Sequence, residues 1–172
     1  METLVNKVAE SGIITIDLST FIPGDDAIAV FDLQPYLFRG LILREKDYRE
    51  ALKQEDWSRF AGKQVHICCT ADAIIPLWAY MLAATYLQPV AAGLHFGSRK
   101  ELEIQVLLQH IATLDLAEYQ DKRIVIKGCG DVSIPEQGYV AITARLLPVV
   151  RSLMYGEPCS TVPVYKKALQ RP

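Results

Sequence analysis

Residues 63–96 read KQVHICCTADAIIPLWAYMLAATYLQPVAAGLHF, and this stretch decides the fold class. Val65–Cys68 is a short apolar run that predicts a buried strand, and Ala92–Phe96 predicts a second one. Ala73–Leu87, between them, has the length and composition of a helix, with Pro76 in its first turn, where proline is tolerated. A strand, a helix and a second strand in this order predict a βαβ unit with parallel strands.

The same alternation of strands and helices continues on both sides of this unit. The further predicted elements are strands at Ile13–Leu18, Ala27–Phe31 and Arg123–Ile126, and helices at Glu45–Gln54, Arg99–Ala112 and Pro135–Leu153. The turn signal Pro23-Gly24-Asp25 separates the first two strands and predicts that they form an antiparallel hairpin. We therefore expect a three-layer α/β fold with a mostly parallel sheet and a small N-terminal antiparallel β element, in a single domain over residues 1–172. A tail without a predicted element follows Leu153.

Composition and charge narrow the classes of partner. The chain has 172 residues, with 18 basic and 20 acidic side chains and a formal net charge of -2. No basic block stands out, so we expect no nucleic-acid partner. The longest apolar stretches, such as Ala73–Ala84, are too short and interrupted to cross a membrane. Met1-Glu2-Thr3 opens a polar start without the apolar core of a signal peptide, so we expect a cytoplasmic protein with reduced thiols.

One short motif occurs twice. Ile75–Tyr80 and Ile134–Tyr139 share the pattern I-P-x-x-[A/G]-Y, and a cysteine precedes each, Cys69 in the first case and Cys129 in the second. Junctions between strands and helices often converge on proline near a helix start, which is one explanation. A duplicated half of the chain is the other. The sequence leaves both open.

The cysteines stand where α/β proteins usually bind ligands. Cys68 and Cys69 end one predicted strand, and Cys129 ends another, between Gly128 and Gly130. In open parallel sheets, ligands bind beyond the carboxyl ends of the strands. We therefore expect Cys69 and Cys129 to lie at the carboxyl ends of parallel strands of one sheet.

The remaining thiol, Cys159, is harder to place. If the last helix runs to Leu153, it ends at the opposite edge of the sheet, and the tail spans at most roughly 20 Å from there. Its reach to the other thiols is therefore marginal. We nevertheless expect Cys69, Cys129 and Cys159 to converge on one centre, because thiols from distant parts of a chain are what a metal site requires.

Several roles for the thiols stay open at this stage. They can be small buried hydrophobes, redox or nucleophilic thiols, or ligands of an iron–sulfur or zinc centre. Tetrahedral zinc would take a fourth ligand, for which Asp72, His66 and Glu157 are candidates, whereas a three-thiolate cluster would leave one position open. His66 is also explained as a core histidine, and Asp72 as a helix cap.

Several segments together resemble a bacterial family known as domain of unknown function 2480. They are Gly40–Asp47, Asp56–Ser58, Cys69–Pro76, Trp78–Met81, Ile126–Cys129 and Leu153–Pro163. The resemblance covers nearly the whole chain and implies no known activity. It places Cys69, Cys129 and Cys159 within family motifs, whereas Cys68 falls where relatives can carry Thr. It also implies iron–sulfur assembly proteins as partners.

The first hypothesis is therefore a metal- or iron–sulfur-binding accessory protein. The alternatives are a small-molecule-binding domain or enzyme with its pocket at the strand carboxyl ends, and a dimeric interaction module without catalysis. We also expect a homodimer, because the tail from Gly156 to Val164 is apolar and no predicted element remains to cover it.

Overall fold

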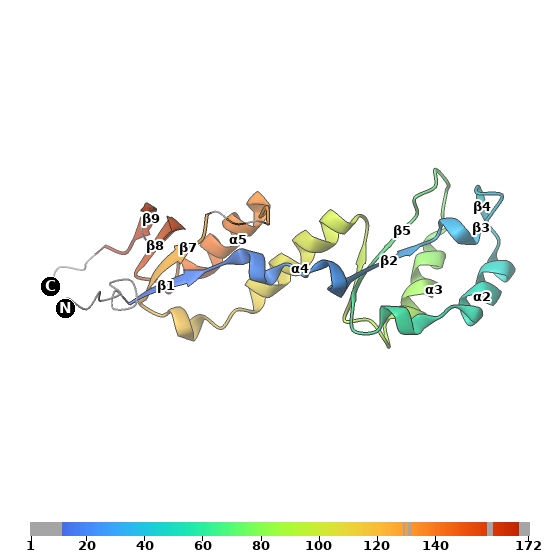
Figure 1. Ribbon diagram of the computed structural model, residues 1–172, viewed down its shortest axis with the longest axis horizontal. Coiled ribbons are helices and arrows are strands. Elements are labelled where there is room, and N and C mark those ends of the chain that lie inside the picture. Colours follow the sequence, from blue (N-terminus) through green and yellow to red (C-terminus); the bar gives the residue numbers. More distant parts are fainter. Residues whose placement is uncertain (1–11, 129, 131, 158–159, 169–172) are drawn as a thin grey trace, which may run out of the picture. The chain divides into compact units, whose positions relative to one another are not determined.

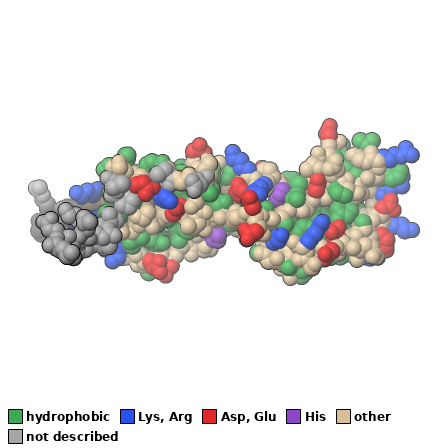
Figure 2. Space-filling view, in the orientation of Figure 1, with side chains coloured by type: hydrophobic (Ala, Val, Ile, Leu, Met, Phe, Trp, Pro, Cys, Tyr) green, Lys and Arg blue, Asp and Glu red, His purple; other side chains and the backbone are tan. Residues whose placement is uncertain are grey.

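The computed structural model describes residues 12–128, 130, 132–157 and 160–168 (Figure 1 and Figure 2). The chain divides into two compact units. Unit 2 comprises Pro23–Gln105, and unit 1 comprises Met1–Ile22 together with Val106–Pro172. Unit 2 therefore interrupts unit 1 in the sequence, and each unit has its own sheet and its own core.

Unit 2 is built on a parallel sheet of three strands in the order β2-β5-β6. The strands are β2 (Ile28–Asp32), β5 (Gln64–Cys68) and β6 (Gly93–Phe96). Helix α2 (Glu45–Gln54) and helix α3 (Leu77–Leu87) complete the unit, with a short antiparallel pair, β3 (Leu37–Phe38) and β4 (Ile42–Leu43). Tyr48 and Leu52, four residues apart on α2, are fully buried, as their spacing predicts.

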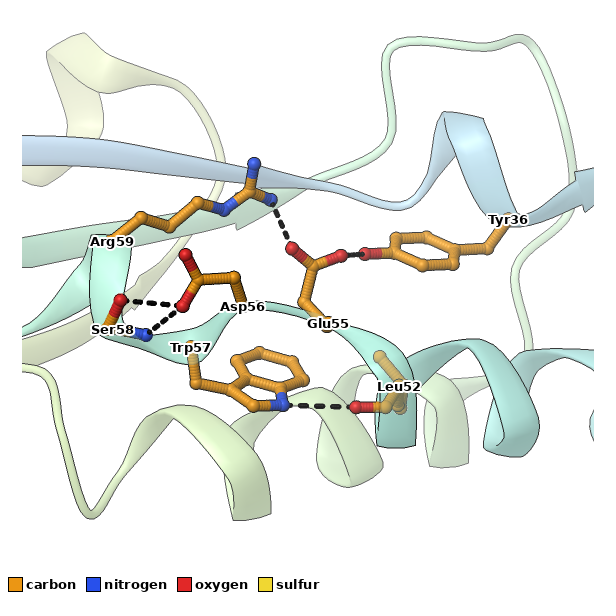
Figure 3. Close-up of polar contacts among 7 residues, drawn as sticks. All are labelled: Tyr36, Leu52, Glu55, Asp56, Trp57, Ser58 and Arg59. Carbon is orange, nitrogen blue, oxygen red and sulfur yellow. Dashed lines mark hydrogen bonds and ion pairs between the residues drawn. The ribbon is translucent and has the colours of Figure 1, made fainter.

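Hydrogen bonds and an ion pair stabilise the end of α2 (Figure 3). The Tyr36 hydroxyl donates to Glu55 Oε2 at 2.6 Å, and Arg59 forms an ion pair with Glu55 at 3.1 Å. Burial, reinforced by Glu55, raises the pKa of Tyr36, which keeps this hydroxyl a donor. The indole of Trp57 donates to Leu52 O at 3.0 Å and satisfies a carbonyl of the last helical turn.

Unit 1 is built on a sheet of four strands in the order β1-β7-β8-β9. The strands are β1 (Ile13–Ile16), β7 (Arg123–Ile126), β8 (Ser152–Glu157) and β9 (Ser160–Lys166). The first three are parallel, and β9 runs antiparallel to β8. Helix α5 (Glu136–Leu146) connects β7 to β8, and α4 (Arg99–Thr113) begins in unit 2 and ends in unit 1.

The two units repeat one another at a constant offset of 59 residues, for example from Asp56 to Asp115 and from Pro76 to Pro135. Each repeat runs from a helix through an aspartate-capped 3₁₀ turn to a strand, a helix that begins after Ile-Pro, and a second strand. Backbone hydrogen bonds recur at the same offset. Matched examples are Gly62 N to Val90 O with Asp121 N to Val149 O, and Ala92 N to Lys63 O with Arg151 N to Lys122 O, all at 2.8–2.9 Å.

Unusual backbone angles recur at the same offset. Gly62 and Asp121 have φ of 68° and 53°, and Gly97 and Gly156 have φ of 110° and 124°. Positive φ is uncommon for residues other than glycine, so its occurrence at Asp121, where the other copy has Gly62, indicates that the two copies share one backbone conformation. The repeated Ile-Pro motif therefore belongs to a repeated structural unit.

The α/β class, with mostly parallel strands and a small antiparallel pair, is confirmed. The predicted hairpin of the first two strands is wrong, because β1 pairs with β7 and β2 with β5, both in parallel. The antiparallel pair is β3–β4 instead. The single-domain organisation stays a prediction.

The predicted last helix is also wrong in its extent. Helix α5 ends at Leu146, shortly before Pro148, which cannot continue a helix. The segment predicted to be helix and tail forms the β8–β9 hairpin. Strands β5 and β7 belong to different sheets, so the strands before Cys69 and Cys129 do not share one sheet as predicted.

Candidate functional site at the carboxyl edges of the sheets

A hydrogen-bonded clasp joins two strands at the carboxyl edge of unit 2. Asp32, the last residue of β2, accepts from Thr70 N at 3.0 Å and from Thr70 Oγ1 at 2.5 Å. It also accepts from Gln34 N at 2.9 Å. Burial alone would raise the pKa of Asp32, but the hydrogen bonds from Thr70 and Gln34 outweigh it and lower the pKa. The carboxylate is therefore ionised at neutral pH and holds the segment that follows β5.

Two adjacent thiols lie in that segment. Cys68 ends β5, Cys69 follows it, and both are partly buried and free. The Cys69 thiol donates to Ala71 O at 3.7 Å. Burial, followed by the negative charge of Asp32 and the electrostatic influence of the neighbouring Cys69, raises the pKa of Cys68. Cys68 is therefore a protonated thiol at neutral pH, which does not suit an activated nucleophile.

An aromatic pair borders the thiols. The rings of Tyr80, on α3, and Phe96, at the end of β6, meet edge to face with centroids 5.2 Å apart. Phe96 is 66% exposed. Burial, followed by Cys69 and Cys68, raises the pKa of Tyr80. This edge of unit 2 therefore combines exposed aromatic surface, two thiols and an ionised carboxylate.

The corresponding edge of unit 1 has the same plan with other residues. Asp17, directly after β1, accepts from Lys127 Nζ at 2.8 Å, and Lys127 directly follows β7. Tyr139 and Tyr155, the counterparts of Tyr80 and Phe96, meet edge to face at 5.7 Å. The Tyr155 hydroxyl donates to Gly128 O at 3.0 Å and ties the ends of β7 and β8 together.

The ion pair between Asp17 and Lys127, which we call the Asp17 clasp, makes the stability of unit 1 sensitive to acid. The hydrogen bond from Lys127, followed by one from Ser19, lowers the pKa of Asp17 from 3.8 to about 2. Because the folded pKa lies below the unfolded one, the clasp stabilises the fold above about pH 4 and loses that effect as the pH falls towards 2. We expect Asp17→Asn to lower the free energy of unfolding by about 1 kcal/mol at neutral pH, after allowance for solvent screening.

Urea denaturation followed by far-UV circular dichroism at about pH 7 and about pH 2 measures this effect. The difference in the free energy of unfolding between the variant and the wild type should vanish at the lower pH. Asp26→Asn removes an exposed carboxylate and serves as the control. An equal loss of stability at both pH values would contradict the clasp.

The predicted metal ligands are distributed over both units. Cys129 and Cys159 lie outside the described residues. His66 Nδ1 lies 3.1 Å from Gly97 O, and Glu157 ends β8. Asp72 is exposed and does not cap α3, which begins after Pro76 without a side-chain cap. Within the part of the chain that the structure describes, no three His, Cys, Asp or Glu side chains form a group that could hold a metal ion.

The sequence analysis did not identify Asp17 and Asp32 as site residues, although a repeated dipeptide marks both positions. Asp17-Leu18 and Asp32-Leu33 repeat the same dipeptide at the carboxyl end of the first strand of each unit. Leu18 and Leu33 are both fully buried, so each Asp-Leu pair turns a carboxylate outward and an apolar side chain inward. The repeat could have indicated both carboxylates as equivalent features of two edges.

Fold and site together define an α/β protein with two equivalent strand-end sites and no recognisable catalytic constellation among its described residues. A family model described as "Protein of unknown function (DUF2480)" matches residues 2–167. The chain therefore belongs to this family. Neither the curated proteins nor the solved structures contain a significant match. Among the described residues, no helix is both long and apolar enough to cross a bilayer.

Proposed function

We propose that the protein is a binding protein whose sites are the carboxyl edges of its two repeated units, and that thiols at these edges hold zinc or an iron–sulfur species. Cys129 and Cys159 are the proposed ligands at the edge of unit 1, and Cys69 is a proposed ligand at the edge of unit 2. In this role the protein serves as a cytoplasmic accessory protein of iron–sulfur assembly, as the family resemblance implies.

The observation that carries the proposal is the course of the chain around two of the thiols. Strands β7 and β8 are parallel neighbours, so their carboxyl ends lie at one edge of the sheet. Gly128, which precedes Cys129, accepts a hydrogen bond from Tyr155, three residues before Pro158. The marginal reach expected for Cys159 rested on a helix ending at Leu153. That objection falls, because β8 carries the chain back to the carboxyl edge.

The raised pKa of Cys68 argues against thiol catalysis by this residue, because a thiol that stays protonated at neutral pH is a poor nucleophile. The neighbouring carboxylate of Asp32 attracts a cation to the same edge.

Anaerobic purification followed by metal and sulfide analysis tests the proposal. We expect about one metal centre per chain, with thiolate charge-transfer absorbance near 400 nm if the centre is iron–sulfur. Cys129→Ser and Cys159→Ser should each reduce the bound metal to below about one fifth of the wild-type content, because loss of a single thiolate opens a thiolate-ligated site.

Cys68→Ser is the matched control, since it removes an adjacent thiol outside the proposed ligand set and should retain the metal. Retention by Cys69→Ser would confine the centre to unit 1. Full metal content in Cys129→Ser would refute the proposal.

We also propose that the protein is a homodimer that associates through the exposed Val162 and Val164 of edge strand β9. Light scattering on the same samples gives the mass of the protein in solution, and the mass of a single subunit would count against the homodimer.

The aromatic pairs favour a second candidate function, the binding of a small molecule without a metal. Phe96 and Tyr155 are 66% and 41% exposed, although each contacts a tyrosine of the helix that precedes its strand. Phe96 ends β6, and Tyr155 lies two residues before the end of β8. Exposed aromatic surface at a strand carboxyl edge is typical of ligand sites. Phe96→Ala would weaken the binding of such a ligand while leaving the metal content unchanged, which separates the two candidates.

A further inference from the structure

A cavity of about 340 Å³ in unit 1 is lined by helix α5 and by strands β7, β8 and β9. The lining residues on β7 and β8 are Ile126, Leu153, Met154 and Tyr155. Tyr139 and Thr143, four residues apart on α5, lie on one side, and Val164 of β9 completes the lining. All of these residues belong to unit 1, and none of them is adjacent in sequence to a residue outside the described part of the chain.

A β-bulge shapes the side of the cavity that β9 forms. Leu153 pairs with Tyr165 and Met154 pairs with Pro163, so Val164 has no partner residue on β8. A bulge bends its strand and redirects the extra side chain, and bulges are common beside functional sites. Val164 is 54% exposed although it lines the cavity. The bulge therefore places an apolar side chain where the cavity meets the solvent.

The repeat within the chain separates the lining that the fold shares from the lining that unit 1 adds. At the offset of 59 residues, three lining residues have identical counterparts, which are Ile126 with Ile67, Tyr139 with Tyr80 and Leu153 with Leu94. Tyr155 and Thr143 carry hydroxyls where unit 2 has Phe96 and Ala84. Strand β9, with Val164, has no counterpart in the three-stranded sheet of unit 2. The repeated unit thus supplies an apolar base, to which unit 1 adds a wall and two hydroxyls.

The lining carries no charged side chain. Among its described residues, the polar side-chain groups are the hydroxyls of Tyr139, Thr143 and Tyr155. The Tyr155 hydroxyl donates to Gly128 O at 3.0 Å, so it offers a ligand only an acceptor. A charged ligand would lose hydration here without gaining a partner of opposite charge. The lining therefore selects an uncharged molecule.

We propose that this cavity binds an uncharged molecule with a single aromatic ring system. Tyr139 and Tyr155 meet edge to face, with ring centroids 5.7 Å apart and an interplanar angle of 74°. A further ring can pack against such a pair in the same offset or edge-to-face geometry, and the thioether of Met154 adds a polarizable contact. The volume lies near the lower end of the range of small-molecule sites, which favours a small ligand.

This proposal deepens the second candidate function, the binding of a small molecule without a metal, and rests on that candidate. It names the class of ligand and one cavity for it. It does not depend on the proposed metal centre, because none of the lining residues is a proposed metal ligand.

Titration of the ¹⁵N-labelled full chain with indole, followed by heteronuclear NMR, tests the proposal. We expect saturable shifts of the amide resonances of α5, β8 and β9, with a dissociation constant below about 1 mM. Val164→Trp places a large ring at the cavity and should weaken indole binding by about tenfold or more, because the added side chain occupies the space of the ligand.

Val162→Trp is the matched control. It adds the same ring two positions earlier on β9, at an exposed residue that does not line the cavity, and should leave indole binding unchanged. Both valines belong to the proposed dimer surface, so this control also accounts for an effect of association. Thermal melting of both variants verifies that they are folded, and the wild-type shifts test the location of the site independently of either variant.

Benzoate and cyclohexanol test the charge and the aromatic ring separately. Binding of either one as tight as that of indole would overturn the proposed ligand class, and undiminished binding by Val164→Trp would overturn the cavity. Shifts confined to Tyr80, Phe96 and their neighbours would support the second candidate function but overturn its assignment to this cavity. Absence of saturable shifts throughout the chain would end both. Metal analysis of the same samples reports separately on the metal centre.

Discussion

Phe31→Ala is expected to lower the free energy of unfolding of unit 2 by about 3–5 kcal/mol, because it empties the centre of an aromatic cluster. Phe31 is 1% exposed and stacks on Tyr36 and Trp57 with centroids 5.5 Å apart, and it meets Phe60 edge to face at 5.9 Å. Both tryptophans of the chain, Trp57 and Trp78, belong to unit 2. Tryptophan fluorescence during urea denaturation therefore reports on this unit.

The neighbouring residue provides the control. Val30 lies on the same strand with 48% of its surface exposed, so Val30→Ala should cost less than about 1 kcal/mol. Far-UV circular dichroism records both units in the same experiment. If the chain is a single domain, the Phe31→Ala transitions seen by fluorescence and by circular dichroism coincide. A loss of stability equal to that of Val30→Ala would show that the aromatic cluster does not stabilise the unit.

Gly156→Ala is expected to destabilise the β8–β9 hairpin by about 2–4 kcal/mol, through backbone strain and a direct clash. Gly156 has φ of 124°, a region that is nearly restricted to glycine. A Cβ atom there would lie 2.5 Å from the carbonyl oxygen of Ser160, and a paired backbone cannot move away cheaply. The change should also reduce the proposed metal binding, because Cys159 lies between β8 and β9 in the sequence.

Gly97→Ala is the matched comparison at the equivalent position of unit 2. Its φ of 110° imposes similar strain, but the added Cβ would meet the Glu101 carboxylate, which is the flexible end of a side chain. We expect Gly97→Ala to cost about 1–2 kcal/mol, less than Gly156→Ala, in urea denaturation followed by circular dichroism. Equal costs at the two positions would mean that the Ser160 carbonyl yields as readily as a side chain.

Local sequence patterns predicted the positions of the strands and helices better than they predicted which strands pair. Periodicity and turn signals located β2, β5, β6 and β7, because apolar alternation is a property of each segment alone. The pairing of β1 with β7 depends on contacts more than 100 residues apart, for which a single sequence contains no local signal. The last helix was predicted to be too long because the apolar residues before and at the start of β8 continue the apolar pattern of α5. Pro148 is the residue that indicates an earlier helix end.

The site was predicted in part. Cys68 and Cys69 do stand at a strand carboxyl end, as the order of elements indicated. The repeated motif was aligned correctly through its Ile-Pro pair, but the cysteines before it are not counterparts, because Cys69 lies seven residues before Pro76 and Cys129 six before Pro135. The offset of 59 makes Gly128 the counterpart of Cys69 and Cys129 the counterpart of Thr70. The two edges therefore present different chemistry on the same backbone plan, and this difference could not be read without the register of the strands.

A protein that contains one unit twice provides its own record of tolerated substitutions. Each residue in one copy is therefore a substitution, already compatible with folding, for its counterpart in the other copy. Exchanging Cys68–Thr70 with Lys127–Cys129 would place each set of edge side chains on the other scaffold. Such exchange variants separate the chemistry of a binding edge from the stability of the unit that carries it, which single alanine substitutions cannot do.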